Sequence, residues 1–163
     1  MKIKKIISGG QTGADMGGLL AGYLNNIPTE GHVPKHCNTE YGSNYTLKMY
    51  NLKETNNINY TSRTRLNVAN SDGTIIFGYT SSSGTKFTID VCKELNKAHH
   101  IVPEHDYDNE DVEIYDNLIL DAKNWIIDNN ISILNVAGNR ESKNPGLQRT
   151  VFWFLTLLQQ EIF

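Results

Sequence analysis

The chain has 163 residues, of which 39% are hydrophobic and 20% charged, and its formal net charge at pH 7 is -3. A chain of this length can bury roughly 68–70% of its unfolded surface, so one domain spanning residues 1–163 is expected to fold without a disulfide or a metal. The negative charge argues against a nucleic-acid polymer as a partner, because proteins that bind such polymers usually carry a strong basic excess. A small anion held by local donors is still allowed.

The cysteines and the apolar runs indicate the compartment. Cys37 and Cys92 lie far apart without CxxC spacing, which favours a reducing environment. Only two consecutive apolar residues, Ile6 and Ile7, precede Ser8, which is too few for the core of a signal peptide. The longest apolar stretch, residues 151–158, is far below the roughly 20 residues of a membrane span. The sequence therefore predicts a cytoplasmic protein without a membrane partner.

A short apolar run, a loop of Gly, Ser and Asn, and a helical pattern follow one another three times. This order is typical of βα units and of a mostly parallel sheet. The first unit has a strand at 3–7, a loop at 8–15 and a helix to about residue 25. The other two have strands at 74–77 and 131–136, loops at 78–84 and 137–146, and helices at 85–97 and from residue 147 to the end of the chain.

Weaker patterns complete the expected architecture. Strands near 31–33 and 100–103 bring the total to about five, and helices near 62–69 and 112–129 fill the crossovers. The sequence predicts a three-layer, Rossmann-like α/β sandwich with a mostly parallel sheet. The segment 33–59 is rich in Asn, Thr and Tyr and has no clear periodicity. It is interpreted either as a loop that closes over a site or as a surface insertion.

The three glycine-rich loops are expected to meet, because loops that follow parallel strands emerge at one edge of the sheet. The first, residues 8–15, is the strongest candidate. Gly9, Gly10 and Gly13 remove side chains just before a helix N-terminus, where backbone N–H groups and the helix dipole favour an anion. The loop matches neither a P-loop nor a dinucleotide fingerprint. A tight βα turn is the alternative interpretation.

The other two loops add hydroxyls and positive charge. The second reads Ser81-Ser82-Ser83-Gly84-Thr85 at a helix start and is suited to phosphate, although an N-cap with a flexible turn would look the same. The third carries Arg140 and Lys143, which can neutralise a phosphate or can be solvated surface charges.

Several single residues stay open between a functional and a structural role. Asp15 falls in the first turn of a helix, where the dipole favours a carboxylate regardless of function. Asp72 precedes Gly73 and can be a turn residue. Arg63 and Arg65 lie beside the long segment, and either can reach the site or stay at the surface. The predicted ligand-binding set is Gly9, Gly10, Gln11, Thr12, Gly13, Asp15, Arg63, Asp72, Ser82, Ser83, Gly84, Thr85, Asn139, Arg140 and Glu141.

No catalytic constellation and no metal centre is predicted. The histidines and their neighbours show no specific ligand spacing, and no Ser-His-Asp or Cys-His arrangement can be argued. The groups considered for a metal are His32 with His36 and Cys37, His99 with His100, and His105 with Asp106. Residues 151–155 are apolar all round a helix, so this helix is expected to be deeply buried or to join two copies in a homo-oligomer.

At these loops the sequence resembles a known family nearly from end to end. The residues that carry the resemblance are Ser8 through Asp15, Ile27-Pro28, Pro34-Lys35, Tyr60, Arg63-Thr64, Asn67-Val68, Ser71 through Thr74, Gly84-Thr85, Thr88, Leu134 through Ser142 and Pro145-Gly146. The chain resembles the putative molybdenum carrier family, a YpsA-like branch of the SLOG superfamily of Rossmann-like ligand-binding domains. The resemblance implies a phosphate-bearing ligand, either a nucleotide of the ADP-ribose type or the molybdenum cofactor, a phosphorylated pterin carried as cargo.

The second loop separates binding from hydrolysis. Relatives that cleave nucleoside monophosphates look like Pro-Gly-Gly-x-Gly-Thr-x-x-Glu there, whereas Thr88 stands in place of the glutamate here. A hydroxyl cannot act as the carboxylate base at neutral pH. Met16 and His32 also depart from the closer family, which has a basic residue and a Trp at these positions. We expect a non-catalytic carrier, sensor or sequestering protein; the alternative is a nucleotide N-glycosidic hydrolase that uses Asp15 or Glu141.

Overall fold

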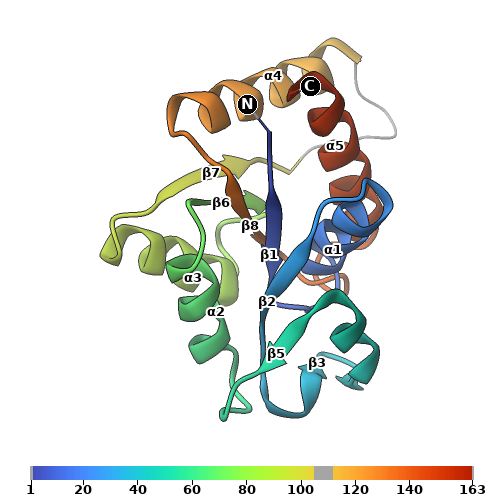
Figure 1. Ribbon diagram of the computed structural model, residues 1–163, viewed down its shortest axis with the longest axis vertical. Coiled ribbons are helices and arrows are strands. Elements are labelled where there is room, and N and C mark those ends of the chain that lie inside the picture. The colour runs from blue at the N-terminus through green and yellow to red at the C-terminus, as the bar shows by residue number, and fades with distance from the viewer. Residues whose placement is uncertain (1, 105–111, 163) are drawn as a thin grey trace.

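The computed structural model describes residues 2–104 and 112–162 and arranges them in three layers (Figure 1). A six-stranded sheet with strand order β5-β2-β1-β8-β6-β7 forms the middle layer, and every pairing within it is parallel. Its strands are β1 (Lys5–Ser8), β2 (Thr29–Val33), β5 (Leu52–Glu54), β6 (Gly73–Phe77), β7 (Ala98–Val102) and β8 (Ile133–Gly138). This architecture confirms the Rossmann-like α/β sandwich that the sequence predicts.

Helices cover both faces of the sheet. One face carries α1 (Ala14–Leu24), α4 (Val112–Asp128) and α5 (Leu147–Ile162), and the other carries α2 (Tyr60–Ala69) and α3 (Ser83–Glu94). In Figure 1, α1 and α5 lie to the right of the strands and α2 and α3 to the left.

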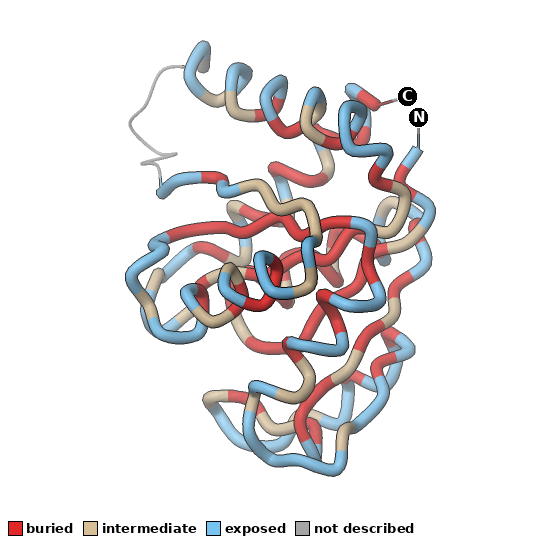
Figure 2. The backbone as a smooth tube through the Cα atoms, turned by 90° about the vertical axis from the view of Figure 1, so that its left-hand side faces the viewer, coloured by how far each residue is buried: buried red, intermediate tan, exposed pale blue. Residues whose placement is uncertain are grey.

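The core follows from the pattern of the strands. All five residues of β6 are buried, as expected for a parallel strand that is covered on both faces (Figure 2). On the α1, α4 and α5 side, Phe77 meets Phe154 edge to face, with ring centroids 5.2 Å apart. On the other side, Val68, Val91 and Cys92 form a smaller cluster between α2 and α3.

The segment 33–59 has regular secondary structure. It holds the sixth strand, β5, the hairpin of β3 (Asn38–Thr39) and β4 (Gly42–Ser43), and two 3₁₀ turns. Strand β5 was not predicted, because three residues are too few to show a period. Buried side chains anchor the segment in a second core, whose members are Leu19, Val33, Cys37, Leu47, Tyr50 and Leu52.

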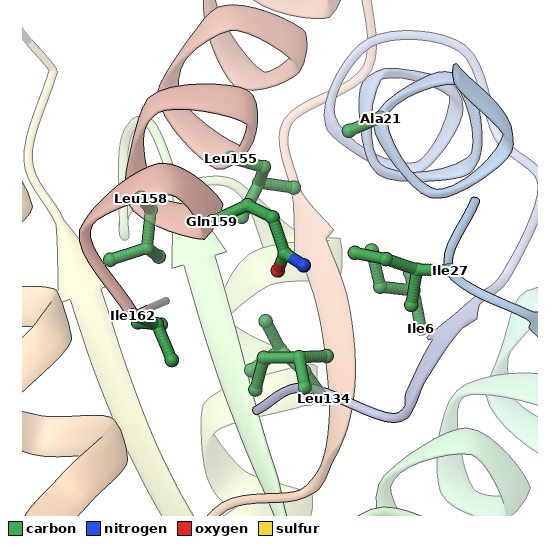
Figure 3. Close-up of a pocket in the computed structure, with 9 residues that line it drawn as sticks. Ile6, Ala21, Ile27, Leu134, Leu155, Leu158, Gln159 and Ile162 are labelled. Atoms are coloured by element: carbon green, nitrogen blue, oxygen red, sulfur yellow. The ribbon is translucent and has the colours of Figure 1, made fainter. Parts of the chain in front are cut away.

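A small cavity lies on the α1 and α5 side of the sheet, near the amino ends of the strands. It measures about 10 Å³, roughly the room of one water molecule. In Figure 3 the amide of Gln159 points into it from α5. The remaining lining is apolar and consists of Ile3, Ile6, Ala21, Ile27, Leu134, Leu155, Leu158 and Ile162.

The C-terminal helix is buried on one side only. Val151, Phe154 and Leu155 lie in the core, whereas the side chain of Trp153 is 51% exposed. Whether this outer face joins two copies stays a prediction. Across residues 2–104 and 112–162, we find no helix with the length and apolar character of a bilayer span.

Candidate functional site

The carboxyl ends of β1, β6 and β8 bring the three glycine-rich loops together. The N–H of Ala14, at the start of α1, donates to the carbonyl of Asn139 over 3.1 Å, which joins the first loop to the third. The N–H of Tyr79 donates to the Asn139 side chain over 2.7 Å, which joins the second loop to the third. The site is therefore formed by backbone of three separate βα units at one edge of the sheet.

Asn139 acts as a clamp between the second and third loops. It is 3% exposed, and its Oδ1 accepts the Tyr79 N–H. Its Nδ2 lies 3.0 Å from the Tyr79 carbonyl, 3.1 Å from Ser82 Oγ and 3.0 Å from Thr85 Oγ1. Because the amide is fully occupied by these partners, Asn139 positions the second loop and is not available for a ligand.

The glycines of the first loop are required by close approaches within the protein. Gly13 has φ +75°, and a Cβ there would lie 2.7 Å from the Glu141 backbone nitrogen. Gly10 has φ +71°, and its Cβ would lie 2.8 Å from Val33 Cγ1 and 2.9 Å from Leu47 Cδ1. Gly10 thus faces the second core, and a larger residue there would disturb packing rather than fill the site.

Asp15 is the buried charge at the centre of the first loop. It is 3% exposed, and its Oδ2 lies 3.3 Å from Arg63 Nη1 and accepts the Gln11 N–H over 3.1 Å. Burial raises the pKa of Asp15, and this effect outweighs the attraction of Arg63, the Gln11 hydrogen bond and the more distant charge of Arg140. The Arg63 guanidinium reaches Asp15 across Gly9, where a side chain would collide with it.

Two arginines share one aromatic ring in the site. The guanidinium carbons of Arg63 and Arg140 lie 5.6 and 5.4 Å from the ring centroid of Tyr60, within the range of cation–π attraction. Tyr60, at the start of α2, was not among the predicted ligand-binding residues. Arg65 instead forms a two-fold surface pair with Glu94, at 2.8 and 3.0 Å. Of the two arginines on α2, Arg63 is therefore the one in the site.

Glu40, from the turn between β3 and β4, also enters the site and was missed. Its carboxylate accepts hydrogen bonds from the hydroxyls of Thr12 and Ser142 and, over 3.1 Å, from the Ser142 N–H. Burial raises the pKa of Glu40, but the hydrogen bonds from Ser142 and Thr12 and the charge of Arg140 outweigh burial and lower it. No sequence signal marks Glu40, because its partners lie 28 and 102 residues away.

Four buried side-chain nitrogens have no hydrogen-bond partner in residues 2–104 and 112–162. They are Gln11 Nε2, His32 Nδ1, Arg63 Nε and Asn144 Nδ2. Buried polar atoms without a partner are rare in folded proteins. Together with the charges of Arg63 and Arg140, they give the site capacity for an additional acceptor group.

The second loop presents a helix start to solvent. Ser82 caps α3 by accepting the Thr85 N–H over 3.3 Å, and Ser83 and Gly84 are exposed. The hydroxyl of Thr88 donates to the Gly84 carbonyl over 3.1 Å within the helix. The position that carries a glutamate in the hydrolase motif thus holds a hydroxyl already bound to backbone.

Two predicted residues serve structural roles. Asp72 precedes β6 and lies at the opposite edge of the sheet, where its Oδ2 accepts the N–H groups of Ser132 and Ile133 over 2.9 and 2.7 Å. We therefore leave it out of the site. Glu141 lies near the site, but its carboxylate accepts the N–H groups of Gly146 and Gln148 over 2.6 and 2.9 Å and caps α5.

The residues considered for a metal do not gather. Within the described part of the chain, no group of three or more His, Cys, Asp or Glu side chains could hold a metal ion. Cys37 and Cys92 are free and buried. His105 and Asp106 lie outside the described residues.

The fold and the loops define a Rossmann-like domain of the SLOG type. The chain belongs to the circularly permutated YpsA SLOG family, which matches residues 6–159. It is also similar to a crystal structure described as a putative molybdenum carrier protein from Syntrophus aciditrophicus, with 33% sequence identity and a TM-score of 0.79. That match covers 99% of this chain and 94% of the other. No curated protein matches the sequence. These comparisons confirm the resemblance seen in the sequence.

Proposed function

We propose that the chain is a non-catalytic binding protein for a small phosphate-bearing molecule that is nucleotide-like or pterin-like. One observation carries the proposal: Arg63 and Arg140 converge at the carboxyl edge beside buried nitrogen donors that have no hydrogen-bond partner among the described residues. Guanidinium groups suit phosphate in charge and geometry, and the carboxyl edge is where open α/β sheets bind ligands. The similarity to the putative molybdenum carrier adds the molybdenum cofactor as a candidate cargo.

The arrangement of carboxylates favours binding over hydrolysis. The hydroxyl of Thr88 is bound to the Gly84 carbonyl, and the carboxylate of Glu141 caps α5. Asp15 is buried against Arg63. A general base must reach the water or hydroxyl that it deprotonates, and neither Glu141 nor Asp15 is free to do so. Purified protein is therefore expected not to hydrolyse nucleoside monophosphates with turnover; turnover that Asp15→Asn abolishes would establish the hydrolase instead.

A thermal-shift panel of nucleotides, ADP-ribose and pterin phosphates tests the binding. A ligand at about 100 times its Kd adds about 2.7 kcal/mol to the free energy of unfolding, which raises the Tm by a few degrees in a domain of this size. Native mass spectrometry of the fresh protein checks for a molecule that is already bound. If no compound shifts the Tm and no molecule is retained, the proposed function is wrong.

A further inference from the structure

The carboxylate of Glu40 is held by donors that belong to two loops of the site. Thr12 of the first loop and Ser142 of the third both donate their hydroxyls to it, and Ser142 adds its backbone N–H. Arg140 contributes a favourable charge. Two hydroxyls and one N–H group, in the field of the positively charged Arg140, are what a phosphate or carboxylate group of a ligand would need. The junction of the two loops is therefore an anion subsite, and a side chain of the protein occupies it.

The rest of the segment is fixed without Glu40. Leu47 and Leu52 are buried in the second core, and β5 pairs with β2 from Leu52 to Glu54. The turn itself projects outward, because Tyr41 is 73% exposed. Glu40 is thus the charged tip of a turn whose base is anchored elsewhere. Such a tip can leave its donors without unfolding the segment.

The hydrogen bonds of the Glu40 backbone also indicate that its side chain can be displaced. Its N–H donates over 3.0 Å to Gln11 Oε1, which also accepts the Thr12 N–H over 3.0 Å. The other end of that amide, Nε2, is buried without a hydrogen-bond partner among the described residues, and Gln11 is only 6% exposed. An unpartnered donor beside the subsite indicates that the arrangement around Glu40 does not satisfy every group there.

We propose that Glu40 is an internal competitor: its carboxylate fills the anion subsite of Thr12 and Ser142 until a phosphate or carboxylate group of the ligand displaces it. The inference rests on the proposed function and adds the regulation of that same site. A binding-competent state that is only partly populated weakens the apparent affinity by its fractional population. Removing the carboxylate of Glu40 therefore strengthens anion binding.

Calorimetric titration with inorganic phosphate tests the competitor on the full chain. Glu40→Gln and Glu40→Ala are expected to bind phosphate roughly tenfold or more tightly than wild type, because the subsite no longer has an internal anion. Glu54→Gln is the matched control: Glu54 lies in the same segment and accepts the His36 N–H over 2.5 Å and pairs with Lys48 over 3.1 Å, so its loss loosens the segment without freeing the subsite. This variant is expected to bind phosphate as wild type does.

The outcomes separate the inference from the proposed function. If the nucleotide panel stabilises wild type but folded Glu40→Gln binds phosphate no more tightly than wild type, Glu40 is a strut and only the inference is overturned. If neither wild type nor any variant binds phosphate or a nucleotide, both are overturned. In an NMR titration of wild type, phosphate should shift the Ser142 amide resonance, and an unmoved resonance at saturating phosphate would place the anion elsewhere.

Discussion

The two ends of the parallel sheet have opposite chemistry. At the amino end, aliphatic side chains such as Leu134 and Leu158 close around a small cavity, and Gln159 is the polar member of its lining. At the carboxyl end, Asp15, Arg63 and a set of hydroxyls and amides lie partly or fully buried. The topology explains the difference, because helix N-termini and their free N–H groups gather at the carboxyl edge, whereas the amino edge can be closed by packing alone. Substitutions at the amino end should therefore change the free energy of unfolding but leave the affinity for a ligand unchanged.

The largest expected effect is a loss of stability caused by a change at the carboxyl end of the sheet. Arg63→Ala leaves the Asp15 carboxylate buried without its ion pair, which should lower the free energy of unfolding by about 3–5 kcal/mol in urea denaturation. The double variant Arg63→Ala with Asp15→Asn should recover part of this loss. Arg65→Ala, which breaks the exposed pair with Glu94, should cost about 0–1 kcal/mol. Equal losses for Arg63→Ala and Arg65→Ala would show that the Asp15 pair is not buried in solution.

The next effect belongs to the amino end alone. Leu134 is 1% exposed and lines the cavity, so Leu134→Ala should lower the free energy of unfolding by about 2–5 kcal/mol. Ligand affinity, measured by calorimetry where the variant is still folded, should stay at the wild-type value. Leu120→Ala, at a position on α4 that is 48% exposed, is the matched control and should be close to neutral. A large loss of affinity in folded Leu134→Ala would break the division between the two ends.

A third effect concerns affinity without stability. Arg140→Ala should weaken binding of the ligand found in the panel by about 1.5–3 kcal/mol, because a charge-assisted contact is lost. Arg140→Lys should restore only part of it if the contact is bidentate. Both variants should keep the wild-type Tm in the absence of ligand to within a few degrees. Wild-type affinity in Arg140→Ala would mean that the ligand does not lie on this edge of the sheet.

The smallest expected effect is on the pH dependence of stability, where the side chains of Glu40 and Asp15 act in opposite directions. The lowered pKa of Glu40 means that it stabilises the fold above its unfolded pKa of about 4.5, and that this contribution is lost as the pH falls through its folded pKa. The raised pKa of Asp15 has the opposite sign, so its ionised form costs stability above its folded pKa and the cost disappears as the pH falls below about 3.8. The stability difference between wild type and Glu40→Gln, about 1.4 kcal/mol for a tenfold effect on affinity, should therefore shrink below pH 4. A difference that grows in acid would contradict the sign.

The sequence was sufficient for the main architecture because β1, β6 and β8 are short, largely apolar runs that are each followed by a glycine-rich loop. Strand β5 was not predicted because it has three residues, and only Leu52 among them is buried. Asp72 was misplaced although the topology could have excluded it: a residue that precedes a parallel strand lies at the amino edge, away from the loops that follow strands. Glu40 could not be found by pattern, because its partners come from distant segments. Tyr60 belongs to the residues that carry the family resemblance, but its place between Arg63 and Arg140 appears only in the folded chain.

The clamp at Asn139 decides which side of the site can move. The Asn139 side chain binds Tyr79, Ser82 and Thr85, so the second and third loops form one rigid unit. Neither loop can swing open without breaking hydrogen bonds of a fully buried amide. Among the described residues, the hydrogen bonds that join the β3–β4 turn to the third loop and to the first loop all involve Glu40. Loss of the Glu40 contacts would therefore free the β3–β4 turn from both loops, whereas the second and third loops would stay joined to each other through Asn139.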